Sequence, residues 1–341
     1  MRAKLLLIAS LLALSTAAAA QETKPAQRLA GATGWLNSPP VTDMDLRGKV
    51  VLVDFWTYTC VNWLRTLPYV RAWSDKYKDQ GLVVIGVHTP EFPFEKDLDN
   101  VQRSVKEMRV AYPVALDSNY AVWRAFANNA WPAVYLVDPQ GRVRYSHLGE
   151  GEYEATEKMI QQLLSEAGQT NVRRDLVAVE AKGLETAADW PNVKSPETYL
   201  GSDQTQNFAS RGGTGLGERR AYSLPGRLAL NYWALAGSWT IKPGFVVLNK
   251  ASGHIAYRFH ARDVNLVMGP EARGKTVRFR VLIDGKAPGA AHGSDVDEQG
   301  NGTVGEQRTY QLVRQPKPIV ERTFEIEFLD PGVEAYGFTF G

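Results

Sequence analysis

Cysteine is the residue this sequence has least of, with Cys60 the single one among 341 residues. An internal disulfide is therefore excluded, and a lone thiol in an exported protein is either buried and inert or kept for chemistry. A charge imbalance is also missing, because the net charge is +2 and Lys and Arg are scattered among Asp and Glu. This balance argues against a nucleic-acid or polybasic membrane partner.

Long apolar runs are missing except at the N-terminus. Arg2 and Lys4 precede a short apolar stretch, Leu5 to Leu14, and small residues follow at 18–20. This order predicts a signal peptide over residues 1–20, cleaved before Gln21. The stretch is too short to span a bilayer. We therefore expect a soluble protein without a membrane span after cleavage, located in the periplasm or otherwise exported.

The length favours two domains. After an N-terminal extension at 21–34, residues 35–170 alternate strand and helix patterns, which predicts an α/β sheet. The apolar run at 50–56 is typical of a strand buried on both faces. Further strands are expected at 82–87, 133–137 and 143–148, and helices at 62–78, 95–108, 120–128 and 152–166.

A polar, weakly periodic segment at 171–195 is interpreted as a linker. Residues 196–341 then show apolar and polar alternation at 255–261, 277–283 and 324–328, separated by Gly- and Pro-containing turns. This pattern predicts an all-β second domain, a β-sandwich or jelly roll.

Chemistry is expected at the end of the first buried strand, where a tight turn leads into Cys60 and a helix begins. Unpaired backbone N–H groups and the helix dipole favour a thiolate at that point. We therefore expect the pKa of Cys60 to lie below the value of about 8.5 for a free cysteine. The alternative is a small core residue that happens to be cysteine.

The segment WTYTCVNWLRTLP at 56–68 resembles the active-site stretch of exported DipZ-type, TlpA-like thiol–disulfide proteins, which reads W-T-Y-x-C-x-N-C-L-R-T-L-P. Segments at 86–101, 112–126 and 131–138 match the same family. Three segments of the β-rich half, RLALNYWALAGSW, RVLIDG and FEIEFLDPGVEA, resemble its C-terminal, carbohydrate-binding-module-like domain. The resemblance implies a thioredoxin-like fold and thiol–disulfide exchange through Cys60.

One departure changes that expectation, because Trp63 stands where the family has its second, resolving cysteine. A mixed disulfide on Cys60 then needs an outside thiol for release, so dithiol turnover is in doubt. The resemblance implies protein thiols and disulfides as partners. The family's fused membrane electron-carrier domain is missing from this sequence, so we expect a separate reductant or membrane reductase.

Supporting residues follow from the same resemblance. Pro132 matches the cis-proline that faces the active-site cysteine, and Trp131 before it would offer backbone groups to an extended peptide. Asp54 matches a buried carboxylate that accepts the proton of the second cysteine, and burial should raise its pKa. With Trp63 present we interpret Asp54 as a relic.

Trp56 opens the matched motif. His88 and Glu91 are expected to be solvated loop residues. Thr57 and Cys60 form a T-x-x-C pattern like that of peroxiredoxins, but those carry a proline where this sequence has Val53. A one-Cys peroxidase therefore remains a minority hypothesis, and a redox-inactive peptide- or glycan-binding envelope protein is the main alternative.

In the second half, Asp295, Asp297, Gln299 and Glu306 approach the spacing of a calcium loop, although a polar turn is the favoured interpretation. The glycine-rich segment at 212–217 lacks the spacing of a nucleotide loop. No organic cofactor is implied. Aromatic rings exposed on such a domain would stack on sugars and form a glycan site, although rings in a β-sandwich more often form the core. The candidates are Tyr199, Tyr222, Tyr232, Trp233 and Trp239.

Overall fold

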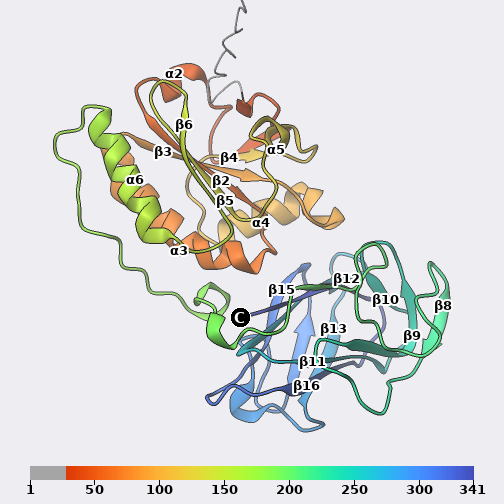
Figure 1. Cartoon of the computed structure of the whole chain (residues 1–341). Coiled ribbons are helices and arrows are strands. Elements are labelled where there is room, and N and C mark those ends of the chain that lie inside the picture. The colour runs from red at the N-terminus through yellow and green to blue at the C-terminus, as the bar shows by residue number, and fades with distance from the viewer. Residues whose placement is uncertain (1–27) are drawn as a thin grey trace, which may run out of the picture.

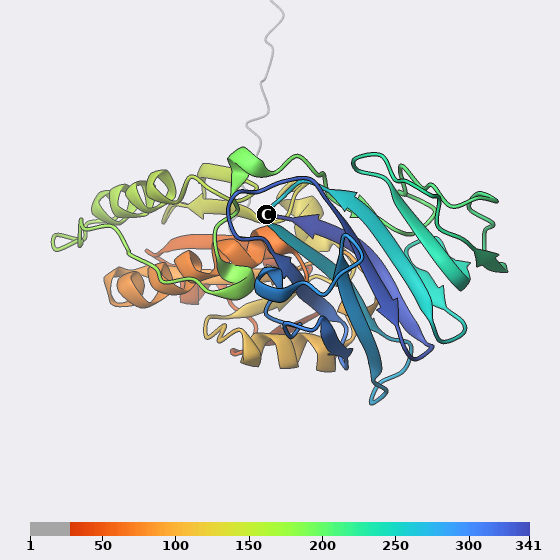
Figure 2. The same cartoon turned by 90° about the horizontal axis from the view of Figure 1, so that it is seen from below.

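The computed structural model describes residues 28–341, so the predicted signal peptide lies outside the described residues. The chain forms an α/β domain followed by a β-domain, which lie side by side (Figure 1). Seen from below, the linker runs along the first domain before it enters the second (Figure 2). Within 28–341, no helix has both the length and the apolar character needed to cross a membrane.

The first domain is built on a mixed sheet of six strands in the order β1-β4-β3-β2-β5-β6. β2 runs parallel to β3, and β3 runs parallel to β4, whereas β5 and β6 add on antiparallel. The bounds are β1 (Gly34–Leu36), β2 (Val50–Trp56), β3 (Leu82–His88), β4 (Val114–Leu116), β5 (Ala133–Val137) and β6 (Val143–Leu148). The predicted strands are thus present, and the short strands β1 and β4 were missed.

Helices cover both faces of this sheet because β2 is apolar on both sides. Leu52 and Trp56 of β2 pack in the core with α3, α4 and α6, whereas Val53 and Phe55 pack in the core with α2 and α5. The predicted helix at 95–108 begins later, because Asp97 accepts the amides of the first turn of α4. The bounds are α2 (Asp43–Leu46), α3 (Val61–Tyr77), α4 (Leu98–Glu107), α5 (Ala121–Ala125) and α6 (Tyr153–Glu166).

The linker contacts the first domain before the chain enters the second. Arg71 of α3 forms an ion pair with Glu185 at 2.8 Å. Glu185 belongs to a short 3₁₀ turn of the linker. The 3₁₀ turns of the chain lie at Lys78–Gln80, Pro93–Lys96, Gly183–Glu185, Trp190–Asn192 and Gly289–Ala291. The linker is therefore an ordered strap against the first domain.

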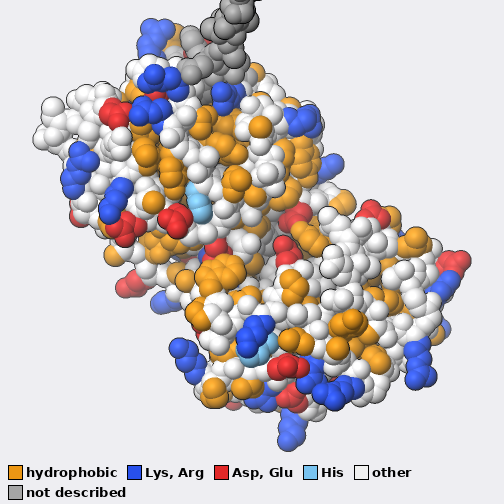
Figure 3. Space-filling view, in the orientation of Figure 1, with side chains coloured by type: hydrophobic (Ala, Val, Ile, Leu, Met, Phe, Trp, Pro, Cys, Tyr) orange, Lys and Arg blue, Asp and Glu red, His pale blue; other side chains and the backbone are white. Residues whose placement is uncertain are grey.

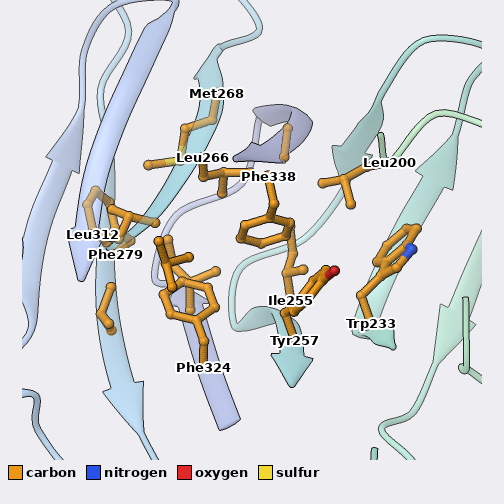
Figure 4. Close-up of a cluster of buried hydrophobic side chains, with 14 of the residues drawn as sticks. Leu200, Trp233, Ile255, Tyr257, Leu266, Met268, Phe279, Leu312, Phe324 and Phe338 are labelled. Atoms are coloured by element: carbon orange, nitrogen blue, oxygen red, sulfur yellow. The ribbon is translucent and has the colours of Figure 1, made fainter. Parts of the chain in front are cut away.

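The second domain is a curled antiparallel sheet of eleven strands, consistent with a β-sandwich. Its interior is filled by aromatic and aliphatic side chains such as Trp233, Tyr257, Phe324 and Phe338 (Figure 4). The predicted all-β class is confirmed. The bounds are β7 (Thr198–Tyr199), β8 (Arg219–Tyr222), β9 (Trp233–Ile241), β10 (Val246–Leu248), β11 (Gly253–Phe259), β12 (Asp263–Pro270), β13 (Val277–Ile283), β14 (Asn301–Val304), β15 (Arg308–Arg314), β16 (Arg322–Phe328) and β17 (Val333–Phe340).

The two domains share a packed interface. Tyr336 of β17 is buried in the hydrophobic cluster of the first domain, with its ring 4.7 Å from that of Phe94. Thr309 of β15 donates a hydrogen bond of 2.6 Å to the carbonyl oxygen of Thr59. This contact brings the second domain directly onto the turn that precedes Cys60.

Candidate active site

Cys60 lies at the N-terminus of α3, as the sequence predicts. β2 ends at Trp56, and the Cys60 amide closes the following turn on the Thr57 carbonyl at 3.2 Å. The Cys60 carbonyl accepts the first helical hydrogen bond from Leu64 at 3.0 Å. The Cys60 side chain is partly buried, whereas the turn residues before it are fully buried. The thiol is thus the accessible group of this turn.

Glu95, which sequence reasoning missed, fixes the shape of the turn. Its carboxylate accepts a hydrogen bond from the Thr59 hydroxyl at 2.6 Å and from the amides of Glu91 and Phe92 at 2.6 and 2.8 Å. Burial raises the pKa of Glu95. Its place within the matched segment at 86–101 was the available signal.

Trp63 points into the core beneath the active-site helix. Its indole is fully buried, donates a hydrogen bond of 2.9 Å to Asp54, and stacks on Trp56 with ring centroids 4.2 Å apart. We call the group of Asp54, Trp56 and Trp63 the inner pocket. The position of the family's resolving cysteine is therefore a packed part of the core.

Asp54 has the Trp63 indole as its hydrogen-bond partner, so the interpretation of this residue as a relic without a role is corrected. Burial raises the pKa of Asp54 to about 7, and the hydrogen bond from the Trp63 indole opposes that rise. Its second oxygen has no hydrogen-bond partner within residues 28–341. The carboxyl that pairs with a cysteine in the family thus supports an indole here.

The expected low pKa of Cys60 is wrong for this site. Burial raises the pKa of Cys60 well above its ordinary value, and the negative charges of Glu91 and Glu197 raise it further. Backbone amides of Trp63 and Asn62 favour the thiolate, as the helix argument predicts, but they are outweighed. The sequence-based expectation included the effect of the helix N-terminus on the pKa. It could not include burial or the carboxylates that the fold places near Cys60.

Glu91 and His88 both differ from the expectation of solvated loop residues. Burial raises the pKa of Glu91 to about 8, and Glu91 accepts a hydrogen bond from the hydroxyl of Tyr199, which belongs to the second domain. His88 is buried against Trp56 and Tyr58, and burial lowers its pKa to about 3, so it is neutral. Glu91 therefore belongs to the site, and His88 belongs to the core.

The bond between Trp131 and Pro132 is cis, as the sequence match predicts. Pro132 is buried and Trp131 is partly buried. The Trp131 indole donates to the Thr89 carbonyl at 3.1 Å and packs on Trp123 with ring centroids 4.3 Å apart. Trp131 also lines a cavity together with Glu91.

Two cavities are lined by residues of both domains, and a third, lined by the second domain alone, adjoins them. One of about 570 Å³ is lined by Val61 and Asn62, which follow Cys60, and by Trp190 and Glu197. A second of about 460 Å³ also contacts Glu197, and shares Tyr199 with a third of about 360 Å³ that contains Glu91 and Trp131. We call these cavities together the interdomain cleft. Figure 3 shows acidic side chains along the boundary between the domains.

The candidate calcium residues do not converge. Asp295 pairs with Arg308 at 2.6 Å and Glu306 with Arg103 at 3.0 Å, while Asp297 accepts hydrogen bonds from Asn301. In the described part of the chain, no three His, Cys, Asp or Glu side chains are grouped as a metal site requires. Gln299 lies in the exposed turn between them.

The candidate glycan-stacking rings are mostly core residues. Trp233 and Trp239 are fully buried and Tyr222 is 6% exposed, so they have no ring face open to a sugar. Tyr199 is partly buried at the cleft, and Tyr232 is 40% exposed. Sequence reasoning did not consider the linker residue Trp190, which is 55% exposed and lines the cleft.

Known proteins match both halves of the chain. A family model described as Redoxin matches residues 23–164, and one described as a thioredoxin-like C-terminal domain matches residues 195–341. The thiol-disulfide oxidoreductase YkuV of Bacillus subtilis is 30% identical over 143 residues, which cover 42% of this chain and 96% of YkuV. Protein DipZ of Mycobacterium tuberculosis is 37% identical over 318 residues, or 92% of this chain.

That match spans 42% of the length of DipZ, so the similarity concerns less than half of that protein. Among solved structures, the solution structure of a thioredoxin-like protein in the oxidized form is 32% identical. It covers 39% of this chain and 90% of that protein, with a TM-score of 0.37.

Proposed function

This chain belongs to the thioredoxin-like redoxin family, and we propose that it is an exported monothiol protein that exchanges disulfides through Cys60. One geometric observation carries the proposal. Cys60 begins α3 with a partly accessible side chain, whereas Trp63, at the resolving position, is fully buried and hydrogen-bonded to Asp54. The one thiol is partly accessible and directly precedes the cleft residues Val61 and Asn62, whereas position 63 is packed in the core.

The chemistry follows from that arrangement. The Cys60 thiolate attacks one sulfur of a partner disulfide, a bond forms between these sulfurs, and the other partner sulfur leaves as a thiolate. Trp63 offers no thiol for a second displacement. An outside thiol must therefore attack the mixed disulfide, regenerate Cys60 and leave joined to the partner.

Partners and location belong to the same proposal. Protein thiols or disulfides are the substrate class, and a separate thiol reductant or membrane reductase completes the cycle. Export is supported by the charged start, apolar stretch and alanine-rich end of residues 1–20.

Mass spectrometry of the protein with a small symmetrical disulfide tests the mechanism. We expect an adduct on Cys60 that persists until an external thiol is added, because no second thiol can displace it. Cys60→Ser is the control and should form no adduct. Insulin reduction with and without glutathione provides the turnover assay, and activity without an added thiol would contradict the proposal.

A redox-inactive peptide- or glycan-binding platform is the second candidate, favoured by the raised pKa of Cys60. In that function the interdomain cleft would bind a ligand without covalent exchange. Failure of Cys60 to form an adduct with any disulfide in the native state, together with reaction after denaturation, would establish this candidate over exchange.

A further inference from the structure

We propose that the interdomain cleft selects disulfides that carry a positive charge next to their sulfur atoms, and that Glu197 sets this preference. The inference rests on the proposed function of Cys60 and adds the substrate class to it. It also assigns a role in substrate choice to the segment that opens the second domain.

The cleft places Glu197 beside the reactive turn. Glu197 lines the same cavity of about 570 Å³ as Val61 and Asn62, the residues that directly follow Cys60. It lines the neighbouring cavity of about 460 Å³ as well. The Glu197 side chain is exposed, so a molecule that enters either cavity can reach its carboxylate.

The charges of the cleft are unbalanced at mildly alkaline pH, where Glu91, with a pKa raised to about 8, is ionised. Glu91, Glu197 and Asp203 line its cavities, against the single cationic side chain of Lys194. Within residues 28–341, neither Glu91 nor Glu197 forms an ion pair, and the hydrogen bond to Glu91 comes from the neutral hydroxyl of Tyr199. A cation on the ligand would supply the missing partner charge.

The same arrangement explains why a nucleophile can lie in an acidic cleft. Without a ligand, burial and, to a smaller extent, the nearby carboxylates raise the pKa of the Cys60 thiol and favour its neutral form. A cationic group that binds near Glu197 opposes this repulsion and favours the thiolate at the moment the disulfide arrives. An anionic disulfide adds to the repulsion, so it both binds less well and meets less thiolate.

The chemical step is an exchange that needs no further oxidant. The Cys60 proton leaves to solvent, the thiolate displaces one half of the substrate, and the departing thiolate takes up a proton. One sulfur–sulfur bond breaks and one forms, so Cys60 is oxidised while half of the substrate is reduced.

Three small symmetrical disulfides of similar size test the preference: cystamine, which is a dication, neutral hydroxyethyl disulfide, and dithiodipropionate, which is a dianion. Rates of adduct formation on Cys60 are measured at one mildly alkaline pH. Each rate is divided by the rate at which the same disulfide reacts with free mercaptoethanol, which corrects for the intrinsic reactivity of that disulfide. We expect corrected rates about ten times higher for cystamine than for the dianion. High salt should reduce the ratio.

Glu197→Gln should lower this ratio about threefold, as removal of one partly screened charge predicts. Glu298→Gln is the matched control, because Glu298 is exposed and outside the cleft, and it should leave the ratio unchanged. Equal corrected rates for all three disulfides, or a ratio that Glu197→Gln does not change, would overturn the inference and leave exchange at Cys60 standing. Reaction with none of the three would overturn both.

Discussion

Cys60 and Trp63 lie three positions apart at the start of α3, but their surroundings differ. Trp63 belongs to the inner pocket, and Cys60 lies next to the interdomain cleft. In the inner pocket, the buried Trp63 indole donates a hydrogen bond to one oxygen of Asp54, while the other oxygen has no hydrogen-bond partner within residues 28–341. Cys60 directly precedes the cleft residues Val61 and Asn62, and its partly accessible thiol is influenced by Glu91 of the first domain and Glu197 of the second. The comparison teaches that one helical terminus can keep a reactive position open while the neighbouring position becomes a structural part of the core.

The largest expected effect is a loss of stability when the inner pocket is disrupted. Trp63→Ala removes a fully buried indole and leaves Asp54 without its donor, so we expect the free energy of unfolding to fall by about 3–5 kcal/mol. Urea unfolding gives the measurement. Trp190→Ala, which removes the exposed indole of the cleft, serves as the matched control and should change stability by no more than about 0.5 kcal/mol. Similar losses in both variants would deny the difference between the two regions.

Asp54 should give the inner pocket a signature in pH. Its pKa is raised from 3.8 to about 7 in the folded protein, so the unfolded chain loses this proton first as the pH rises. Stability is therefore greatest below pH 3.8 for this group and declines up to about pH 7, by an amount on the order of 4 kcal/mol.

Asp54→Asn keeps an acceptor for the Trp63 indole and removes the titration. The difference in unfolding free energy between wild type and variant, followed across this pH range, isolates the contribution of Asp54 from the other carboxylates. A constant difference would show that Asp54 titrates normally in the folded protein.

The cleft should respond to a different substitution. Glu91→Gln removes one negative charge near Cys60, so we expect the pKa of the thiol to fall. The rate of alkylation by a neutral reagent against pH gives this pKa. Asp54→Asn should leave the pKa of Cys60 unchanged, because Asp54 is not among the groups that shift this pKa. A response to both variants would mean that the pocket and the cleft are one electrostatic unit.

The smallest expected effect concerns the contact between the domains. Thr309→Val removes the hydrogen bond to the Thr59 carbonyl and should cost about 1 kcal/mol. Thr303→Val, at an exposed position of β14, is the control for the substitution itself. Thermal unfolding compares the two, and equal effects would show that the second domain does not stabilise the active-site turn.

Local pattern predicted much of this protein, because strands such as β2 and helices such as α3 carry their own periodicity. The position of Cys60 at a helix start and the cis bond before Pro132 also followed from residues close together in the chain. The pKa of Cys60 did not, because it is raised mainly by burial and further by Glu91 and Glu197, and Glu197 is distant in sequence and reaches the site through the packing of the second domain.

The partner of Asp54 was missed for a related reason. A carboxyl inside an apolar strand indicates burial, but sequence does not say which donor will reach it. The family resemblance suggested a thiol and therefore left Asp54 without a role. In the structure the donor is the indole nitrogen of Trp63, which lies 2.9 Å from Oδ2 of Asp54.

The stacked indoles of the inner pocket also have an optical consequence. Trp56 and Trp63 lie with ring centroids 4.2 Å apart and planes inclined by 20°, so their electronic transitions couple and contribute to near-ultraviolet circular dichroism. The carboxyl that one indole contacts has a pKa of about 7. Ionisation of that carboxyl changes the electric field across the pair, which makes the pair an intrinsic chromophore for the protonation state of the core.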